Sequence, residues 1–104
     1  EKVARARAHL VEAGLADLAE IREGDALETL ARDLPATVDV LLLDGHKPLY
    51  AEILALVAPH LRAGSFVVAD NADACPDYKA LVCAPGSGYL SIPFAGDVEL
   101  TMKL

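Results

Sequence analysis

Positive charge is scarce in this sequence, and no stretch of it is long and apolar enough to cross a bilayer. Nine Lys and Arg residues stand against 16 Asp and Glu residues, which gives a formal net charge of -7 at pH 7. Nucleic-acid binders and anionic-membrane binders gather Lys and Arg into clusters, and no such cluster is present. The N-terminus also lacks the basic region and apolar stretch of a secretory signal. We therefore expect a cytoplasmic protein with no nucleic-acid partner and no membrane partner.

Cysteine is equally sparse. Cys75 and Cys83 fit neither the CxxC spacing of a metal site nor a disulfide-rich secreted framework, so we interpret both as reduced and without a chemical role. Hydrophobic residues are abundant by contrast, at 54% of 104 residues, which suffices to fill one small core. This composition predicts one small domain with a single core, without repeats or low-complexity tracts.

The hydrophobic pattern predicts alternating helices and strands. Helices are expected over residues 2–13, 26–33, 48–57 and 76–82, and strands over residues 18–22, 38–43, 65–69, 89–94 and 97–104. The strands at 38–43 and 65–69 are almost continuously apolar, which is typical of strands buried on both faces, whereas 97–104 alternates and predicts a half-exposed antiparallel strand. This alternation indicates an α/β fold. No N-cap residue precedes the first helix, so we expect the chain to belong to something longer.

Polar residues follow the two buried strands at the point where each strand ends. Asp44 and Lys47 come after the strand at 38–43, and Asp70 and Asn71 come after the strand at 65–69. Because the carboxyl ends of neighbouring parallel strands meet at one edge of a sheet, these side chains are expected to converge. Two carboxylates and one amide oxygen suit a hard cation such as Mg²⁺. A partly desolvated Lys47 beside the cation would have a lowered pKa and could serve as a general base.

Ordinary structural roles remain open for each of these residues. Asp44 could cap the helix that begins near Pro48, and Asp70 with Asn71 could form an Asx-turn. Lys47 could be a solvated residue at a helix start, although a cation there opposes the helix dipole. His46 is interpreted as a surface residue.

Two further segments were considered as ligand contacts. Asp25 follows a predicted strand and precedes a predicted helix, so it could accept a hydrogen bond from an adenine amino group or cap the helix that begins at Ala26; spacing alone favours the cap. The loop at residues 85–88 lacks the G-x-G-x-x-G spacing and does not lead into a helix, so no phosphate-binding role is assigned to it.

The sequence as a whole resembles class I S-adenosylmethionine (SAM)-dependent O-methyltransferases of the catechol O-methyltransferase type. The resemblance is carried by the segments at 12–15 (EAGL), 23–26 (EGDA), 38–50 (VDVLLLDGHKPLY) and 61–71 (LRAGSFVVADN). Its most specific part is the D-x-x-K motif followed by the D-N pair. The resemblance implies a Rossmann-like methyltransferase sheet, mostly parallel with an antiparallel C-terminal strand, whose first two strands are missing from this chain.

The resemblance also implies roles for individual residues. Asp44, Asp70 and Asn71 match the family's Mg²⁺ ligands, and Lys47 matches the lysine that takes the proton from the acceptor hydroxyl. The expected contacts to SAM are Asp25, Ala26, Asp44, Gly45 and His46. The acceptor is expected to be a small hydroxylated, catechol-like molecule. The chain departs from the family where Gly45 replaces a bulkier residue, and no counterpart of the family's second substrate-holding acid is found.

The missing strands have a structural consequence. In the implied fold they would lie beside the strand at 38–43, so this strand is expected to expose an edge, which favours association with another chain. We expect a homo-oligomer, a strand-swapped association or a longer protein, and an inactive isolated chain. Two alternative functions are a catalytically inactive fragment and a response-regulator-like receiver domain. The receiver needs an acid pair after its first strand and a Lys after its last parallel strand, and Asp70-Asn71-Ala72 offers no such Lys.

Overall fold

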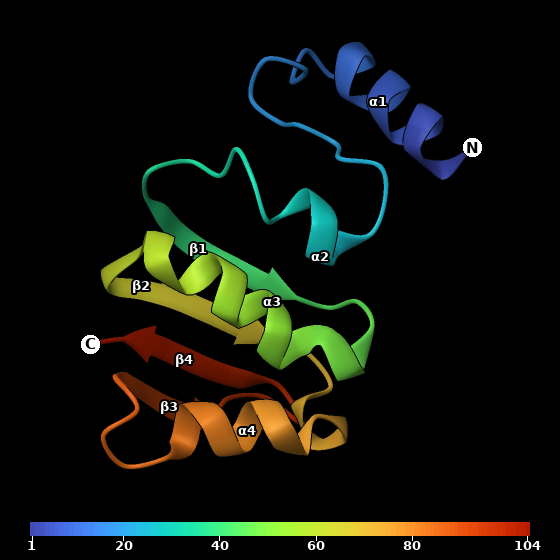
Figure 1. The fold of residues 1–104 in the computed structure, drawn as a ribbon. Coiled ribbons are helices and arrows are strands. Elements are labelled where there is room, and N and C mark those ends of the chain that lie inside the picture. The colour runs from blue at the N-terminus through green and yellow to red at the C-terminus, as the bar shows by residue number, and fades with distance from the viewer.

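The computed structural model describes residues 1–104 and contains one four-stranded sheet (Figure 1). Its strands are β1 (Val38–Leu43), β2 (Leu61–Ala69), β3 (Tyr89–Pro93) and β4 (Glu99–Lys103), in the order β1-β2-β4-β3. β1 and β2 are parallel, and β4 runs antiparallel to both of its neighbours, β2 and β3. β1, β2 and β3 run in one direction and β4 runs opposite to them, so the sheet is mixed with an antiparallel C-terminal strand, and its α/β arrangement confirms the predicted fold class.

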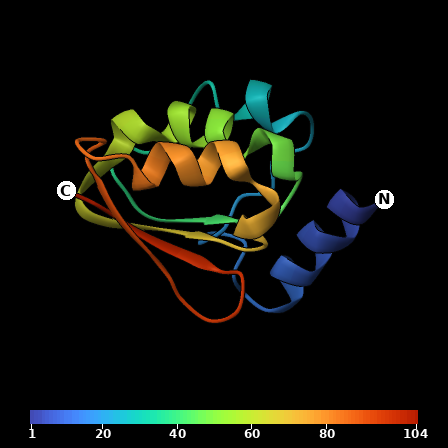
Figure 2. The same ribbon diagram turned by 90° about the horizontal axis from the view of Figure 1, so that it is seen from below.

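The helices are distributed unevenly around this sheet. They are α1 (Lys2–Glu12), α2 (Ala26–Thr29), α3 (Tyr50–Val57) and α4 (Pro76–Cys83), with 3-10 turns η1 (Lys47–Leu49), η2 (Ala58–His60) and η3 (Ala72–Ala74). Figure 2 shows α3 and α4 side by side over one face of the sheet, whereas Figure 1 shows α1 beyond the β1 side of the sheet, and α1 buries none of its residues. None of the helices has both the length and the apolar character needed to traverse a bilayer.

The hydrophobic core lies between α3, α4 and the sheet face that they cover. Its fully buried members include Tyr50 and Leu54 of α3, Tyr78 and Val82 of α4, and Val67 of β2. The apolar spacing in each helix places these residues on one side, and the continuous apolar run of β2 supplies the opposite wall. The core therefore fixes the start of α3 against the carboxyl end of β2.

The other face of the sheet carries two rows of apolar side chains and is largely uncovered. Strand register aligns the first row and the second row as Val40–Phe66–Met102–Leu90 and Leu42–Val68–Leu100–Ile92. Val40 and Leu42 are 60% and 64% exposed. β1 is also the outer strand of the sheet, so the open edge expected at residues 38–43 is present. We call these eight residues the open face.

Apolar and polar side chains alternate along β4 as predicted, but the polar ones are buried. Glu99 is 3% exposed and Thr101 is fully buried, while Leu100 and Met102 belong to the open face. The hydroxyl of Ser91 donates to Glu99 Oε2 at 2.6 Å and lies 2.7 Å from Thr101 Oγ1. Burial of polar groups is tolerated here because each of them has a hydrogen-bond partner.

The prediction of a strand at residues 18–22 is wrong, because this segment is irregular and no strand lies beside it to complete a ladder. Its backbone is held by side chains instead: the Arg7 guanidinium donates to the carbonyl of Ile21 at 3.0 Å. The helix predicted over 26–33 is shorter than expected and ends at Thr29. The Arg22 guanidinium donates to the carbonyl of Thr29, the last residue of α2, and to the carbonyls of Arg32 and Asp33 beyond it. Asp33 adopts a positive φ of 58°.

Two other boundaries follow from local chemistry. α1 ends at Glu12, and Gly14 adopts φ +73° with Leu15 N donating to the carbonyl of Leu10 at 2.9 Å, which is a glycine C-cap. β2 begins earlier than predicted, at Leu61 rather than Ser65, because Leu61 pairs with Val38 across a register shift in which β2 carries extra residues before Phe66.

Candidate functional site at the strand ends

The two strands that carry the predicted site residues end side by side. Leu43 of β1 pairs with Ala69 of β2, and the next backbone hydrogen bond runs from Asp70 N to the carbonyl of Leu43 at 2.9 Å. Asp44 and Asp70 therefore leave the sheet at neighbouring strand ends, on the same edge. We refer to Asp44, Lys47, Asp70 and Asn71 as the strand-end cluster.

Lys47 lies close to Asp44 in this cluster. Its Nζ is 3.9 Å from Asp44 Oδ1 and 3.0 Å from the hydroxyl of Tyr50. The hydrogen bond to Tyr50, with smaller contributions from Asp44 and Asp70, raises the pKa of Lys47 against the opposing effect of desolvation. The lowered pKa predicted from the sequence applies to Lys47 beside a bound cation, whose charge would oppose these contributions.

Asn71 occupies a left-handed backbone conformation, with φ 57°, directly after β2. Its backbone N donates to Asp70 Oδ1 at 2.9 Å, so part of the local hydrogen bonding expected of a turn is present. Its side-chain Nδ2 donates to Asp97 Oδ2 at 3.4 Å, and the backbone N of Ala72 donates to the carbonyl of Asp97 at 2.8 Å. The segment before β4 therefore holds Asn71 at the edge of the cluster.

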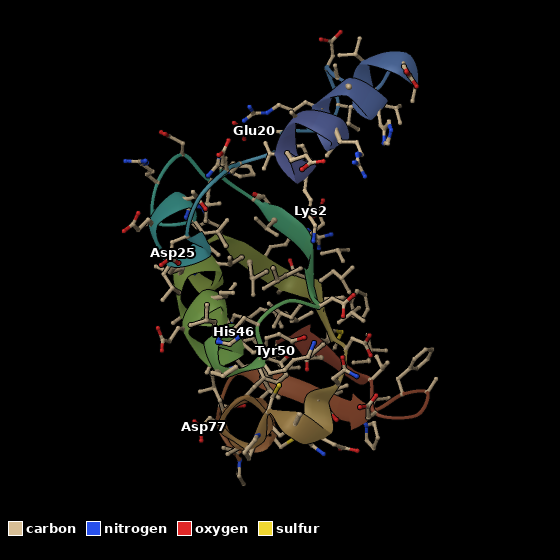
Figure 3. All side chains as sticks on the ribbon, turned by 90° about the vertical axis from the view of Figure 1, so that its right-hand side faces the viewer. Lys2, Glu20, Asp25, His46, Tyr50 and Asp77 are labelled. Carbon is tan, nitrogen blue, oxygen red and sulfur yellow. The ribbon has the colours of Figure 1, made fainter.

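The residues expected to contact a cofactor are less closely connected to the cluster. Asp25 caps α2 by accepting a hydrogen bond from Leu27 N at 2.9 Å, which is the structural role that its spacing favoured. Ala26 is the first residue of α2 and is half-buried. Gly45 and His46 are exposed, and His46 lies at the same end of α3 as Tyr50 (Figure 3). Asp44 makes no helix-capping hydrogen bond, because His46 occupies the cap position of η1.

Two hollows are relevant to ligand binding. A small one, of about 210 Å³, lies beside Lys47 and is lined by Pro48, Ala51, Cys75 and Tyr78 among others. A larger one, of about 600 Å³, lies between α1 and residues 16–21 and includes none of the strand-end cluster. We favour the smaller hollow as the ligand site, because Lys47 of the cluster lines it. The larger hollow is bounded by α1, which buries none of its residues.

Residues 1–72, more than half of the chain, match the sequence profile of a family described as "Methyltransferase domain". The chain belongs to this methyltransferase family. The assignment leaves no support for the receiver alternative. No curated protein matches the chain significantly.

Solved methyltransferase structures share this fold. The O-methyltransferase TomG from Streptomyces achromogenes, involved in tomaymycin synthesis and solved with SAM, is 25% identical with a TM-score of 0.75, over 96% of this chain and 56% of TomG. An O-methyltransferase from Bacillus cereus, solved with SAH, is 17% identical with a TM-score of 0.78, over 97% and 58%. A methyltransferase from Geobacter sulfurreducens is 22% identical with a TM-score of 0.72, over 97% and 52%. The chain thus spans little more than half the length of these proteins.

The methyltransferase chain offers oxygen donors, but few carboxylates, for a cation at the strand ends. No three His, Cys, Asp or Glu side chains gather into a potential metal site. The set predicted from the sequence has two carboxylates, Asp44 and Asp70, and the amide oxygen of Asn71. Mg²⁺ accepts such a set, because it is usually bound through one or two carboxylates and keeps several water ligands. The donor chemistry therefore fits a divalent cation, and the assignment of these three ligands stays a prediction.

Sequence reasoning missed two residues of the candidate site. Tyr50 is three residues after Lys47, a spacing that places both on one side of a helical turn, yet it was considered only as part of the segment 38–50 that carries the resemblance. Asp97 precedes an antiparallel strand, and the start of such a strand lies at the carboxyl end of its parallel neighbours. That topological signal was available in the predicted strand at 97–104.

Proposed function

We propose that this chain is part of a SAM-dependent O-methyltransferase that uses a divalent cation and acts on a small hydroxylated, catechol-like acceptor. The observation that carries the proposal is the strand-end cluster, in which Asp44 and Asp70 leave neighbouring strands and Lys47 lies within 3.9 Å of the first. Membership of the methyltransferase family supports the reaction class. Two of its structural neighbours are O-methyltransferases solved with SAM or SAH, which supports the cofactor.

The proposed cofactor contacts come from two segments. Asp25 and Ala26 begin α2, and Asp44, Gly45 and His46 follow β1. The exposure of Asp25, Gly45 and His46 leaves them accessible to a ligand. Because Asp25 already caps α2, a contact to SAM would be a second role for its carboxylate.

The chemical roles divide between positioning and proton transfer. Asp44, Asp70 and Asn71 would hold the cation, which when bound acidifies a coordinated hydroxyl and fixes its orientation. Lys47, the basic member of the cluster, would take the hydroxyl proton in its neutral form, which a neighbouring cation would favour. The hollow lined by Pro48, Ala51 and Pro76 offers a partly apolar surface beside Lys47 for the body of the acceptor. Alignment of acceptor and methyl donor would supply most of the catalysis.

The open face and the β1 edge suggest how the chain is completed. We propose that they are covered by further polypeptide, either from a longer methyltransferase or from a second copy in a homo-oligomer or strand-swapped association. The chain spans 52–58% of three structural neighbours, which supports the first arrangement. We expect the isolated chain to be inactive in either case.

Lys47→Ala in the intact enzyme tests the role of the lysine. We expect turnover to fall by at least about 100-fold, the usual contribution of a general base, with SAM affinity nearly unchanged. Lys79→Ala is the matched control, because Lys79 also pairs with one carboxylate, Asp73 at 3.0 Å, but lies on α4 away from the cluster. Turnover retained in Lys47→Ala would refute the proposed base.

Calorimetric titration with Mg²⁺ tests the ligands separately. Asp44→Asn and Asp70→Asn should each weaken binding by about ten-fold or more, because each removes a charged ligand from a site with few carboxylates. Asp73→Asn is the control, since Asp73 is exposed and pairs only with Lys79. Equal Mg²⁺ affinity in all three variants would rule out a cation at the strand ends.

A further inference from the structure

The hydroxyl of Tyr50 connects Lys47 to the end of β2. It accepts a hydrogen bond from Lys47 Nζ at 3.0 Å and donates to the backbone carbonyl of Asp70 at 2.9 Å. The ammonium also lies 5.2 Å from the centre of the Tyr50 ring. One phenol therefore joins the candidate base to the strand end that carries two of the proposed cation ligands, Asp70 and Asn71.

The position of this phenol is itself firmly fixed. Tyr50 is 1% exposed and packs edge-on against Tyr78, with ring centres 6.0 Å apart and an interplanar angle of 87°. Lys47, by contrast, is only partly buried and sits on a flexible four-carbon stem. Its nearest carboxylate oxygen, on Asp44, is 3.9 Å away, which is too long for a direct hydrogen bond. Tyr50 is thus the only side chain that accepts a hydrogen bond from the Lys47 ammonium.

We propose that Tyr50 is a positioning residue that holds the Lys47 ammonium group in register with the carboxyl end of β2. The inference rests on the proposed function, because it assigns Tyr50 an effect on turnover through Lys47. Without the phenol hydroxyl, Lys47 is free to swing towards Asp44 or into solvent, and the reacting hydroxyl loses a fixed proton acceptor. A displacement of this kind lowers the rate more than it lowers substrate binding.

Tyr50→Phe in the intact enzyme is the direct test, with Tyr89→Phe as the control. Tyr89 also has a lysine ammonium over its ring, that of Lys103 at 5.4 Å from the ring centre, but it lies on β3 and belongs neither to the strand-end cluster nor to the hollow beside Lys47. We expect Tyr50→Phe to lower kcat by about ten-fold, the effect of one lost hydrogen bond to a charged group, with KM for acceptor and SAM within about two-fold of wild type. Equal kcat in the two variants would overturn the proposal.

A second readout does not depend on catalysis. Lysine-selective ¹H–¹⁵N NMR spectra detect ammonium groups whose protons exchange slowly because they are hydrogen-bonded. The Lys47 signal, assigned by its loss in Lys47→Ala, should disappear in Tyr50→Phe and persist in Tyr89→Phe. Persistence in Tyr50→Phe would show that the phenol does not hold the ammonium and would overturn the proposal.

The outcomes separate this inference from the proposed function. If Lys47→Ala retains turnover, the lysine is not the base and the proposed mechanism fails, whatever Tyr50→Phe does. If Lys47→Ala abolishes turnover and Tyr50→Phe behaves like Tyr89→Phe, only the positioning role fails. Where Lys47→Ala keeps measurable residual turnover, Tyr50→Phe should lower it no further, since the two residues act through one contact; a further loss of the same size would indicate a merely structural role.

Discussion

Replacement of Leu42 by lysine tests whether the open face is a contact surface. Leu42 lies on the outer strand β1, is 64% exposed, and forms one row with Val68, Leu100 and Ile92. Because most of its surface already faces solvent, Leu42→Lys should change the free energy of unfolding of a single chain by less than about 0.5 kcal/mol. Any larger effect must come from association.

The size of that effect follows from the exposed fraction. Full burial of a leucine side chain contributes about 1.5–3 kcal/mol, and nearly two thirds of that surface is still exposed in Leu42. In a symmetric dimer that covers the open face, the substitution in both copies would therefore weaken the free energy of association by roughly 2–4 kcal/mol. This corresponds to roughly a 30- to 1000-fold rise in the dissociation constant. Desolvation of the new ammonium adds to this loss.

Sedimentation velocity over a concentration series measures the dissociation constant of the chain and of the variant. Leu81→Lys is the control, because Leu81 is 42% exposed but lies on α4, on the covered side of the sheet. We expect Leu42→Lys to shift the chain towards monomer and Leu81→Lys to leave its assembly nearly unchanged. A wild-type chain that stays monomeric throughout, or a variant that associates as tightly as wild type, would refute the reasoning.

Three smaller predictions concern single side chains. Burial raises the pKa of the Tyr78 hydroxyl to about 12, so the stability that the neutral hydroxyl contributes is complete below its unfolded pKa of 10 and is lost as pH rises through 12. Between pH 10 and 12 the free energy of unfolding, from urea titrations, should fall by roughly 2–3 kcal/mol more in wild type than in Tyr78→Phe. An equal fall in both proteins would contradict the raised pKa. Arg22→Ala should lower the free energy of unfolding by about 1–3 kcal/mol, because three carbonyls lose a charged donor. The control Arg62→Ala should lower it by less than about 1 kcal/mol, because Arg62 pairs with the exposed Asp39. Similar losses in the two variants would argue against the carbonyl contacts of Arg22. Asp25→Ser keeps a side-chain cap on α2 and removes the carboxylate, so SAM affinity should fall while the melting temperature stays nearly constant, and unchanged affinity would leave Asp25 as a helix cap only.

The positions of the strand ends could be predicted because the same sequence pattern occurs at the end of both strands. Each of β1 and β2 is almost continuously apolar and is followed directly by an aspartate, Asp44 and Asp70 respectively. When two such strands pair in parallel, the aspartates that follow them lie at neighbouring strand ends on one edge of the sheet. The same reasoning predicted the antiparallel C-terminal strand from its alternation, and the order β1-β2-β4-β3 agrees with it.

Other features depend on tertiary contacts that no local pattern contains. Alternation in residues 97–104 shows which side chains share a face but not which face is covered, and the covering helices lie over Glu99 and Thr101. The apolar segment at 18–22 resembles a strand, yet a strand needs a neighbour and none lies beside it. The spacing of Lys47 and Tyr50 indicates contact between them, but only the packing of α3 on β2 brings the Asp70 carbonyl to the phenol.

The structure separates the proposed metal and proton chemistry from the proposed cofactor contacts. The strand-end cluster depends on β1, β2 and the start of α3, which meet in the buried core and are linked by the Asp70–Leu43 and Tyr50–Asp70 hydrogen bonds. Asp25 lies instead on the short helix α2, which has no buried residue. Replacement of the Asp25 side chain should therefore leave the geometry of the cluster intact, because its hydrogen bond goes to Leu27 of α2 and not to a member of the cluster. Mg²⁺ affinity is accordingly expected to respond to Asp44 and Asp70 but not to Asp25, even where SAM affinity responds to Asp25 and Asp44.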